Sequence, residues 1–249
     1  MTKFIEGIVL KATDYQEKSK ILQVFSREHG LISIYLRGAN EYRQRTYSLA
    51  QELTHASFSV YYKAGGLSTS YSGEVINGFM NLKLDFDKNI FLFHLFELLL
   101  KVLEQHHPQP TLFDLILEVM VLVDETDDIL LHHVLTLAIE LKLLYFIGLA
   151  PVLDRCVECG KAQNITTFVP DLGGFICRDC IIHHPHSVYY SIDALKNLIT
   201  LYTQSINELK TIQTNPKVIE ELRMIIDEYY RFHLGVKTHS RSYLPKLNN

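Results

Sequence analysis

The stretches Cys156-Val157-Glu158-Cys159 and Cys177-Arg178-Asp179-Cys180, with seventeen residues between them, hold all four cysteines of the chain. A tetrahedral ion such as zinc needs four ligands, and each CxxC turn aims two sulfurs at one point. Two such turns complete the coordination and leave no position for water or substrate. The spacing therefore predicts a structural metal site, not a catalytic one.

Other uses of four cysteines fit this spacing less well. Unrelated buried thiols or two disulfides are weak alternatives, because chance rarely leaves every cysteine in paired CxxC turns. A four-thiolate iron centre has the same spacing, but zinc is the commoner occupant of this ligand set. We therefore predict one structural Zn²⁺ per chain, bound by Cys156, Cys159, Cys177 and Cys180.

The composition is that of a globular protein. A chain of 249 residues with 47% hydrophobic content can bury a substantial core, in one large or two modest domains. The first seven residues lack the pattern of a secretory signal, and reduced thiols fit the cytosol, so we expect a cytoplasmic protein. In the most apolar stretch, 90–103, His94, Glu97 and Lys101 form a polar stripe, which favours a buried amphipathic helix over a membrane span.

Charge is distributed unevenly along the chain. The net charge of -4 gives no global reason to expect a nucleic-acid partner. Residues 1–80 nevertheless hold nine Lys/Arg against seven Asp/Glu, and residues 229–249 hold four Lys/Arg and no acid. We therefore expect a polyanion to contact the two ends of the chain. Any single basic residue is nevertheless more often a solvated surface charge.

Residues 4–79 have the pattern of a small β-barrel. Short runs rich in β-branched and aromatic residues alternate with glycine-containing turns, and they predict strands at 5–13, 20–25, 31–36, 56–62 and 67–75. Closure of five strands would remove exposed sheet edges, which favours an OB-type barrel. The interval 40–53 does not alternate and is expected to be a loop or a short helix.

The pattern becomes helical after Leu84. Helices are predicted at 87–105, 111–124, 128–147, 191–208 and 215–233, with Thr111 and Asp114 as a capping pair, Asp128 and Ser191 as caps, and Gly235 as a terminator. The cysteine segment, about 154–182, interrupts them. The predicted fold class is α+β and multidomain: an OB-fold barrel at 1–80, then an α-helical domain at 81–249 with an inserted zinc ribbon.

Sequence motifs for common enzymes are absent. The chain has no GxSxG nucleophile elbow, no GxxxxGK[ST] phosphate loop and no strand-flanked GxGxxG. Histidine clusters at 106–107, 132–133 and 183–186 could bind a second metal, but adjacent helical histidines point about 100° apart. The carboxylates Asp124, Glu125, Asp127 and Asp128 fit helix capping and solvation.

Basic residues are interleaved with aromatic residues at the end of the third predicted strand. Six lie within thirteen residues, and a similar cluster follows on the next strand: Tyr35, Arg37, Tyr42, Arg43, Arg45 and Tyr47, then Tyr61, Tyr62 and Lys63. Single-stranded nucleic acid is bound in this way, with guanidinium groups on phosphates and rings on unstacked bases. Tyrosines that pack the barrel and solvated arginines explain the pattern equally well.

Three segments resemble the RecO family of DNA repair and recombination mediators. The first runs from Glu6-Gly7-Ile8-Val9-Leu10 to Arg37-Gly38-Ala39, the second comprises 149–156 with Gly173-Gly174-x-x-Cys177, and the third comprises 230–235 with Ser240-Arg241-x-x-Leu244. Together they cover nearly the whole chain. The family's dense basic run after the first segment is here Asn40-Glu41-Tyr42-Arg43-Gln44-Arg45, which has half the usual charge.

The resemblance implies a bacterial, nucleoid-associated mediator that is not an enzyme. Such a protein binds single- and double-stranded DNA, anneals complementary strands, recognises the acidic-apolar C-terminal tail of single-stranded-DNA-binding protein, joins RecR, and thereby indirectly helps to load RecA. From the residues and this resemblance together we predict phosphate contacts in two groups: Lys11, Arg37, Arg43 and Arg45, then Lys237 and Arg241. Two rival readings are a metal-dependent nucleic-acid-processing enzyme and a zinc-ribbon scaffold that binds only proteins.

Overall fold

The computed structural model describes residues 2–247, and its chain divides into two compact units. Unit 1 comprises the residues up to Asp127 together with Ser240–Leu244, and unit 2 comprises Asp128–His239 with the residues from Pro245 onward. The units group residues by packing, whereas the domains predicted at 1–80 and 81–249 group them by secondary structure. These domain limits stay a prediction.

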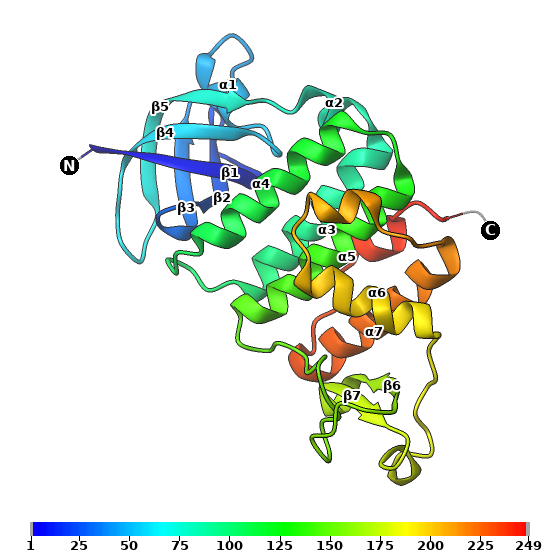
Figure 1. Cartoon of the computed structure of the whole chain (residues 1–249). Coiled ribbons are helices and arrows are strands. Elements are labelled where there is room, and N and C mark those ends of the chain that lie inside the picture. Colours follow the sequence, from blue (N-terminus) through cyan, green and yellow to red (C-terminus); the bar gives the residue numbers. More distant parts are fainter. Residues whose placement is uncertain (1, 248–249) are drawn as a thin grey trace. The chain divides into compact units, whose positions relative to one another are not determined.

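Residues 2–77 of unit 1 contain the strands of a closed five-stranded barrel (Figure 1). Its strands follow the spatial order β1-β2-β3-β5-β4, and β4 pairs with β1 to close it: β1 Thr2–Tyr15, β2 Ser19–Ser26, β3 Gly30–Arg37, β4 His55–Tyr61 and β5 Ser68–Asn77. Only the β3–β5 pair is parallel. The predicted OB-type barrel is confirmed, because each expected apolar run became a strand.

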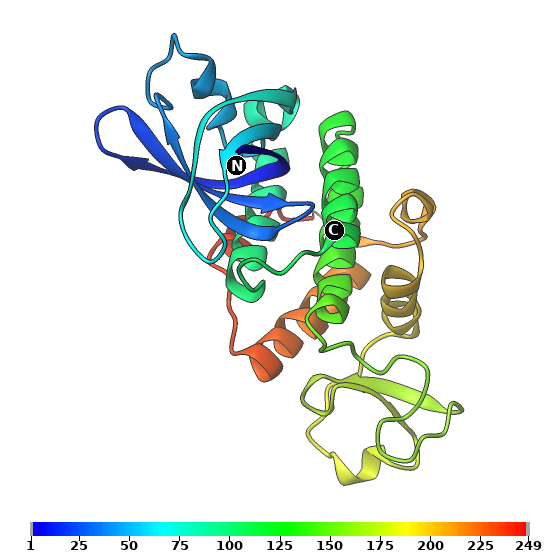
Figure 2. The same ribbon diagram turned by 90° about the vertical axis from the view of Figure 1, so that its left-hand side faces the viewer.

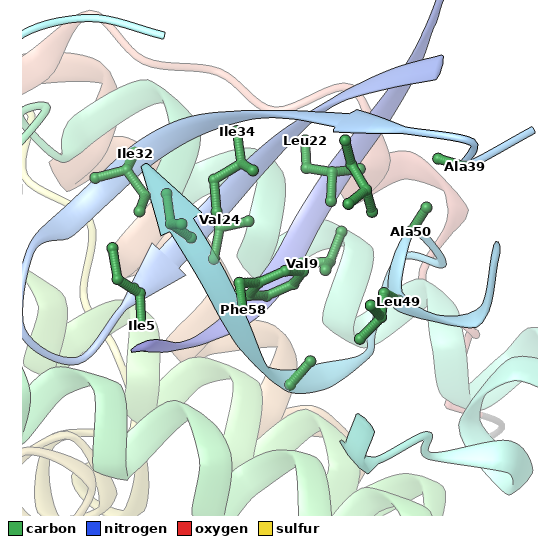
Figure 3. Close-up of a cluster of buried hydrophobic side chains, with 13 residues drawn as sticks. Ile5, Val9, Leu22, Val24, Ile32, Ile34, Ala39, Leu49, Ala50 and Phe58 are labelled. Carbon is green, nitrogen blue, oxygen red and sulfur yellow. The ribbon is translucent and has the colours of Figure 1, made fainter. Parts of the chain in front are cut away.

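Buried apolar residues from β1 to β4 fill the barrel interior, and the half-buried Val75 of β5 packs against them (Figure 3). Along β3, Ile32, Ile34 and Leu36 are fully buried, so the residues between them must face outward. Leu49 and Ala50 join the same core from the short helix α1, Arg45–Leu49, and its C-cap. The interval that the sequence left open therefore contains a helix, and this segment lies at one end of the barrel (Figures 1 and 2).

Three helices complete most of unit 1: α2 Met80–Leu84, α3 Phe86–Val102 and α4 Pro110–Glu125. The helices predicted at 87–105 and 111–124 are confirmed, but α2 was not predicted. The capping pair proposed for Thr111 and Asp114 is wrong. Pro110 occupies the first turn, where it needs no partner for an N–H group, and Asp114 instead forms an ion pair with Arg27.

The polar stripe of α3 binds the returning end of the chain. Ser240 donates from its backbone N–H to Glu97 Oε2 at 2.9 Å, and its hydroxyl lies 3.0 Å from His94 Nδ1. Lys101 pairs with Glu97 at 2.8 Å. The stripe that interrupts the apolar run therefore anchors the 3₁₀ turn η4, Ser240–Tyr243, within unit 1.

Unit 2 contains α5 Ile129–Phe146, the ribbon, α6 Ile192–Thr203 and α7 Pro216–Leu234. Asp128, Ser191 and Asn215 cap the three helices, each accepting a backbone N–H three residues on, and Gly235 ends α7 at φ 62°. Helix α6 stops five residues before the predicted Glu208. It stops because Gln204 is extended and Glu208 folds back to accept the N–H of Ser205.

Helix α5 is the one described helix that is long and apolar enough to cross a membrane. Two thirds of it, 67%, is buried within the protein, and it packs against α6 and α7 of its own unit. Tyr230 of α7 donates to the carbonyl of Glu140 at 2.8 Å. These contacts are those of a core helix in a globular unit.

The ribbon consists of β6 Ile165–Val169 and β7 Gly174–Cys177, joined by the 3₁₀ turn η1 Pro170–Leu172, with η2 Ile181–His183 after the second CxxC turn. A further 3₁₀ turn, η3 Glu208–Thr211, lies outside the ribbon and precedes α7. The small antiparallel sheet presents Cys177 at the end of β7. The predicted insertion between the third and fourth long helices is therefore confirmed.

Two glycines with positive φ allow a matched test of barrel packing. A Cβ on Gly30 (φ +65°) would lie 2.1 Å from the carbonyl oxygen of His107, whereas one on Gly65 (φ +69°) would meet nothing within 4 Å. Gly65→Ala should cost about 1 kcal/mol from backbone conformation alone. Gly30→Ala should cost about 1 to 3 kcal/mol more, because the loop after α3 must move. Urea unfolding of both variants measures the difference, and equal losses would contradict it.

Candidate nucleic-acid interface and metal centre

Aromatic side chains gather on the outer surface of the barrel. The register pairs Tyr35 of β3 with Thr69 of β5, and Thr69 in turn with Tyr61 of β4, so these three positions form one row across the sheet. Tyr61 is 58% exposed and Tyr71 is 55% exposed. We call this set the aromatic face: Phe4, Tyr15, Tyr35, Tyr61 and Tyr71.

A hollow of about 550 Å³ opens in the aromatic face beside Arg37. Tyr35, Arg37 and Tyr71 line it together with the β1–β2 turn, residues 16–19. The hydroxyl of Tyr35 lies 2.9 Å from Ser19 Oγ, and its ring meets the edge of Tyr15 with centroids 5.9 Å apart. One guanidinium therefore shares the hollow with two aromatic rings, one of which is held in place.

The loop after β3 carries the next two predicted cations. Arg43 and Arg45 are exposed, and Tyr42 beside them is 82% exposed. The rings of Tyr42 and Tyr47 meet edge to face, with centroids 5.3 Å apart. Lys11 is exposed after a register shift between Val9 and Lys11 in β1. Among the described residues, the side chains of Lys11, Arg37, Arg43 and Arg45 make no ion pair or side-chain hydrogen bond.

The second predicted group is not one cluster within a unit. Lys237 belongs to unit 2, whereas Arg241 belongs to unit 1. Arg241 is half-buried and donates from Nη1 to His94 Nε2 at 3.2 Å, which fastens η4 to α3. A phosphate contact by either residue stays a prediction, and for Arg241 the structure adds a role in packing.

Other members of the aromatic face were missed in the sequence. Phe4, at 78% exposure, lies opposite Ser59 in β1, one residue before the strand predicted at 5–13. Tyr71 follows the buried Ser70, so period-two alternation could have placed it outside. Lys3 lies 5.4 Å from the ring of Tyr62, so the predicted cluster at 61–63 also combines a ring with a cation.

Tyr62 and His29 form a stacked pair in this second cluster. Their ring centroids are 4.3 Å apart and nearly parallel, at 19°. Burial, and then the charge of Lys3, lower the pKa of His29. The imidazole is therefore neutral at pH 7 and acts as a flat ring.

The four cysteines meet in one cluster, and within residues 2–247 it is the one group of potential metal ligands. Their sulfurs lie within 4.8 Å of one another, and Cys159 Sγ is 3.6 Å from Cys177 Sγ. Tetrahedral zinc with sulfur at about 2.3 Å requires sulfur atoms about 3.8 Å apart. The cluster fits such an ion, and the four thiols are not joined in disulfides.

Backbone amides prepare the site for thiolates. Burial opposes ionisation of Cys156, but N–H groups of Cys159, Cys177 and Glu158 lower its pKa to about 6. Burial and the other three sulfurs raise the pKa of Cys180. Four adjacent thiols thus ionise together only with a cation among them, so the donor set matches a bound divalent metal.

The histidine and carboxylate clusters have structural contacts. His183 Nδ1 and His184 Nε2 lie 2.7 and 3.2 Å from the two oxygens of Glu158, in the first CxxC turn. Asp124 accepts the N–H of Leu82 at 2.8 Å, and Asp128 caps α5. These interactions position loops and helix ends around the ribbon and α2.

Two family models cover almost the entire chain. The model described as "Recombination protein O N terminal" matches residues 1–79, and "Recombination protein O C terminal" matches residues 83–242. The chain belongs to the RecO family. Among its relatives are proteins named DNA repair protein RecO from Bacillus pumilus, 30% identical, and Halalkalibacterium halodurans, 31% identical, each over 98% of this chain and 94% of the relative. The RecO resemblance of the sequence is thus confirmed.

Metal removal should loosen the ribbon and leave the rest folded. A zinc-thiolate site contributes about 10 to 16 kcal/mol in small peptides, but the barrel and helices here have their own cores. We expect one zinc per chain by elemental analysis. After chelation, hydrogen exchange should rise at residues 152–190 and stay unchanged in the barrel.

Cys156→Ser should reproduce this effect of chelation, whereas Lys161→Ala, an exposed neighbour in the same turn, should not. Loss of the barrel's protection after chelation would contradict the local role. Iron in place of zinc would contradict the assignment of the metal.

Proposed function

We propose that this RecO-family chain is a non-enzymatic mediator of DNA repair and recombination. It binds single- and double-stranded DNA through the barrel and promotes annealing of complementary strands. With RecR and single-stranded-DNA-binding protein it helps to load RecA. The observation that carries the DNA-binding part is the hollow in the aromatic face, where Arg37 lies beside Tyr35 and Tyr71.

The chemistry of that hollow suits an unpaired strand. A guanidinium offers several donors to a phosphate, and the exposed rings offer flat faces to bases, each worth about 1 to 3 kcal/mol. Base stacking is tolerant of sequence, because every base has a flat face. We therefore expect binding without sequence preference, as annealing of arbitrary complementary strands requires.

Binding to duplex DNA would depend on the cations alone, because stacked bases cannot reach the rings. Lys11, Arg37, Arg43 and Arg45 are exposed and have no carboxylate partner among the described residues. Four such cations support a modest, salt-sensitive affinity. Single strands should therefore bind more tightly than duplex at the same ionic strength.

Arg37→Ala, Arg43→Ala and Arg45→Ala together should weaken binding to a fluorescent oligonucleotide. The slope of log K against log salt should fall by about 2, because each lost phosphate contact on a single strand removes about 0.7. The matched control replaces three exposed lysines of unit 2, Lys196, Lys210 and Lys217, with alanine. An unchanged slope in the arginine variant would reject this interface.

Strand annealing is the assay that tests the mediator function. Complementary oligonucleotides coated with single-stranded-DNA-binding protein should anneal faster when this chain is added, and the gain should disappear when the partner lacks its C-terminal tail. Strand cleavage that depends on an exchangeable metal would favour the rival enzyme. No retention of DNA at low salt would favour the protein-binding scaffold.

A hollow of about 430 Å³ in unit 2 is our proposed binding site for the partner's tail. Its apolar lining comes from the ribbon and α7 and includes Phe168, Val188 and Phe232. Arg231 at its rim lies 2.5 Å from Glu228, so a tail carboxylate would compete for that guanidinium. Because Asp171 and Glu228 also line the hollow, the apolar end of the tail would supply most of the binding and Arg231 would receive its terminal carboxylate.

Phe232→Ala should weaken binding of a synthetic tail peptide about tenfold or more, since a buried phenylalanine contributes about 1.5 to 3 kcal/mol. Tyr145→Ala is the matched control, because Tyr145 is another exposed aromatic residue of unit 2, at 64% against 50% for Phe232. Fluorescence anisotropy with the labelled peptide measures both. Equal affinities of the two variants would exclude this hollow as the tail site.

A further inference from the structure

Three large apolar side chains are exposed around α2. Met80 is 61% exposed, Leu84 is 80% exposed and Phe86 is 66% exposed. Met80 and Leu84 are four residues apart and share one face of the helix, while Leu82 on the other face is fully buried. Single exposed apolar residues are ordinary, but adjacent ones mark an interaction surface.

The apolar side chains border an acidic hollow of about 660 Å³. Leu84 and Phe86 line it, together with four carboxylates and one ammonium group: Asp85, Asp124, Glu125 and Asp127, and Lys88. Lys88 Nζ is already 2.6 Å from Asp127 Oδ1. The hollow is therefore negative, and a DNA backbone would be repelled from it. We call Met80, Leu84, Phe86 and the hollow the α2 surface.

The α2 surface is held rigidly within unit 1. Asp124 at the end of α4 accepts the N–H of Leu82 at 2.8 Å, and Lys83 Nζ donates to Thr54 Oγ1 at 2.6 Å. Asp85 caps α3 through the N–H of Lys88. Binding of a partner here does not require this segment to become ordered, so the entropic cost of ordering does not reduce the affinity.

We propose that the α2 surface docks an amphipathic helical segment of a partner protein that carries lysine or arginine beside its apolar face. Leu84 and Phe86 would meet the apolar residues of that segment, and Glu125 and its neighbours would meet the cations. We infer a basic partner because the hollow is negatively charged and would repel an acidic segment. The hollow of the α2 surface and the hollow of the aromatic face have no lining residue in common, and they differ in charge.

The test uses a fluorescein-labelled 18-residue peptide with leucine at helical i, i+3, i+4 and i+7 positions and lysine elsewhere. Fluorescence anisotropy with the full chain should show saturable binding that weakens as salt rises. Two control peptides have the same leucines with glutamate in place of lysine, or the same composition in scrambled order. Both should bind at least tenfold more weakly.

Variants of the chain locate the binding site. Leu84→Ser with Phe86→Ser, and separately Glu125→Lys, should each weaken binding of the lysine peptide tenfold or more. Ile192→Ser is the matched control, since Ile192 is 70% exposed in unit 2. The oligonucleotide affinity of all variants should equal that of the unaltered chain, which also shows that they fold. Glu125→Lys keeps the test valid if the double variant fails to fold.

Two results would overturn the proposal. The first is equal binding of the lysine peptide to the unaltered chain and to Glu125→Lys. The second is a concentration-dependent dimer in sedimentation velocity that Leu84→Ser with Phe86→Ser abolishes, because the surface would then bind a second copy of this chain. Neither result bears on the proposed DNA interface.

Discussion

Closure of the barrel is the constraint on which the DNA-binding account depends. Because β4 pairs with β1, the five strands enclose a single apolar interior, and each strand must turn alternate residues outward. In β3, Ile34 and Leu36 point into the barrel interior. Tyr35 and Arg37, which alternate with them, therefore point outward. The aromatic face is thus a consequence of how the core is packed, and it is held by a backbone that cannot slide in register.

The four thiols give the ribbon a fixed point of assembly, as closure gives the barrel a fixed strand register. The ribbon has a small core of its own, in which Ile176 and the buried cysteines pack together. A core of this size contributes little alone, and a bound ion supplies what apolar burial does not. A metal ion bound by the four thiols would therefore support unit 2 and take no part in the DNA contacts proposed on the barrel.

Much of the fold could be predicted because its patterns are long and periodic. Strand alternation, helix caps such as Asp128 and the CxxC pairs are local signals. Helix α2 was missed because five residues, begun by Phe79 at φ 47°, are too short to show a period. The role of Arg241 was also hidden, because its contact with His94 joins residues 147 apart in the sequence.

Only part of the candidate interface could be predicted from the sequence, because some of its residues are brought together by contacts between distant segments. Arg37, Arg43 and Arg45 were found as a run in the sequence, whereas Phe4 and Tyr71 join the face through pairing between strands. Three acids of the α2 surface, Asp124, Glu125 and Asp127, form a cluster in the sequence, but only the packing of α2 against α4 brings them beside Leu84 and Phe86.

Photo-crosslinking of single-stranded DNA tests the central claim most directly. An oligonucleotide with 5-iodouracil at defined positions, irradiated with the full chain, should crosslink to rings of the aromatic face, and mass spectrometry should identify Phe4, Tyr35, Tyr61 or Tyr71. Crosslinks found mainly on aromatic residues of unit 2 would contradict the account.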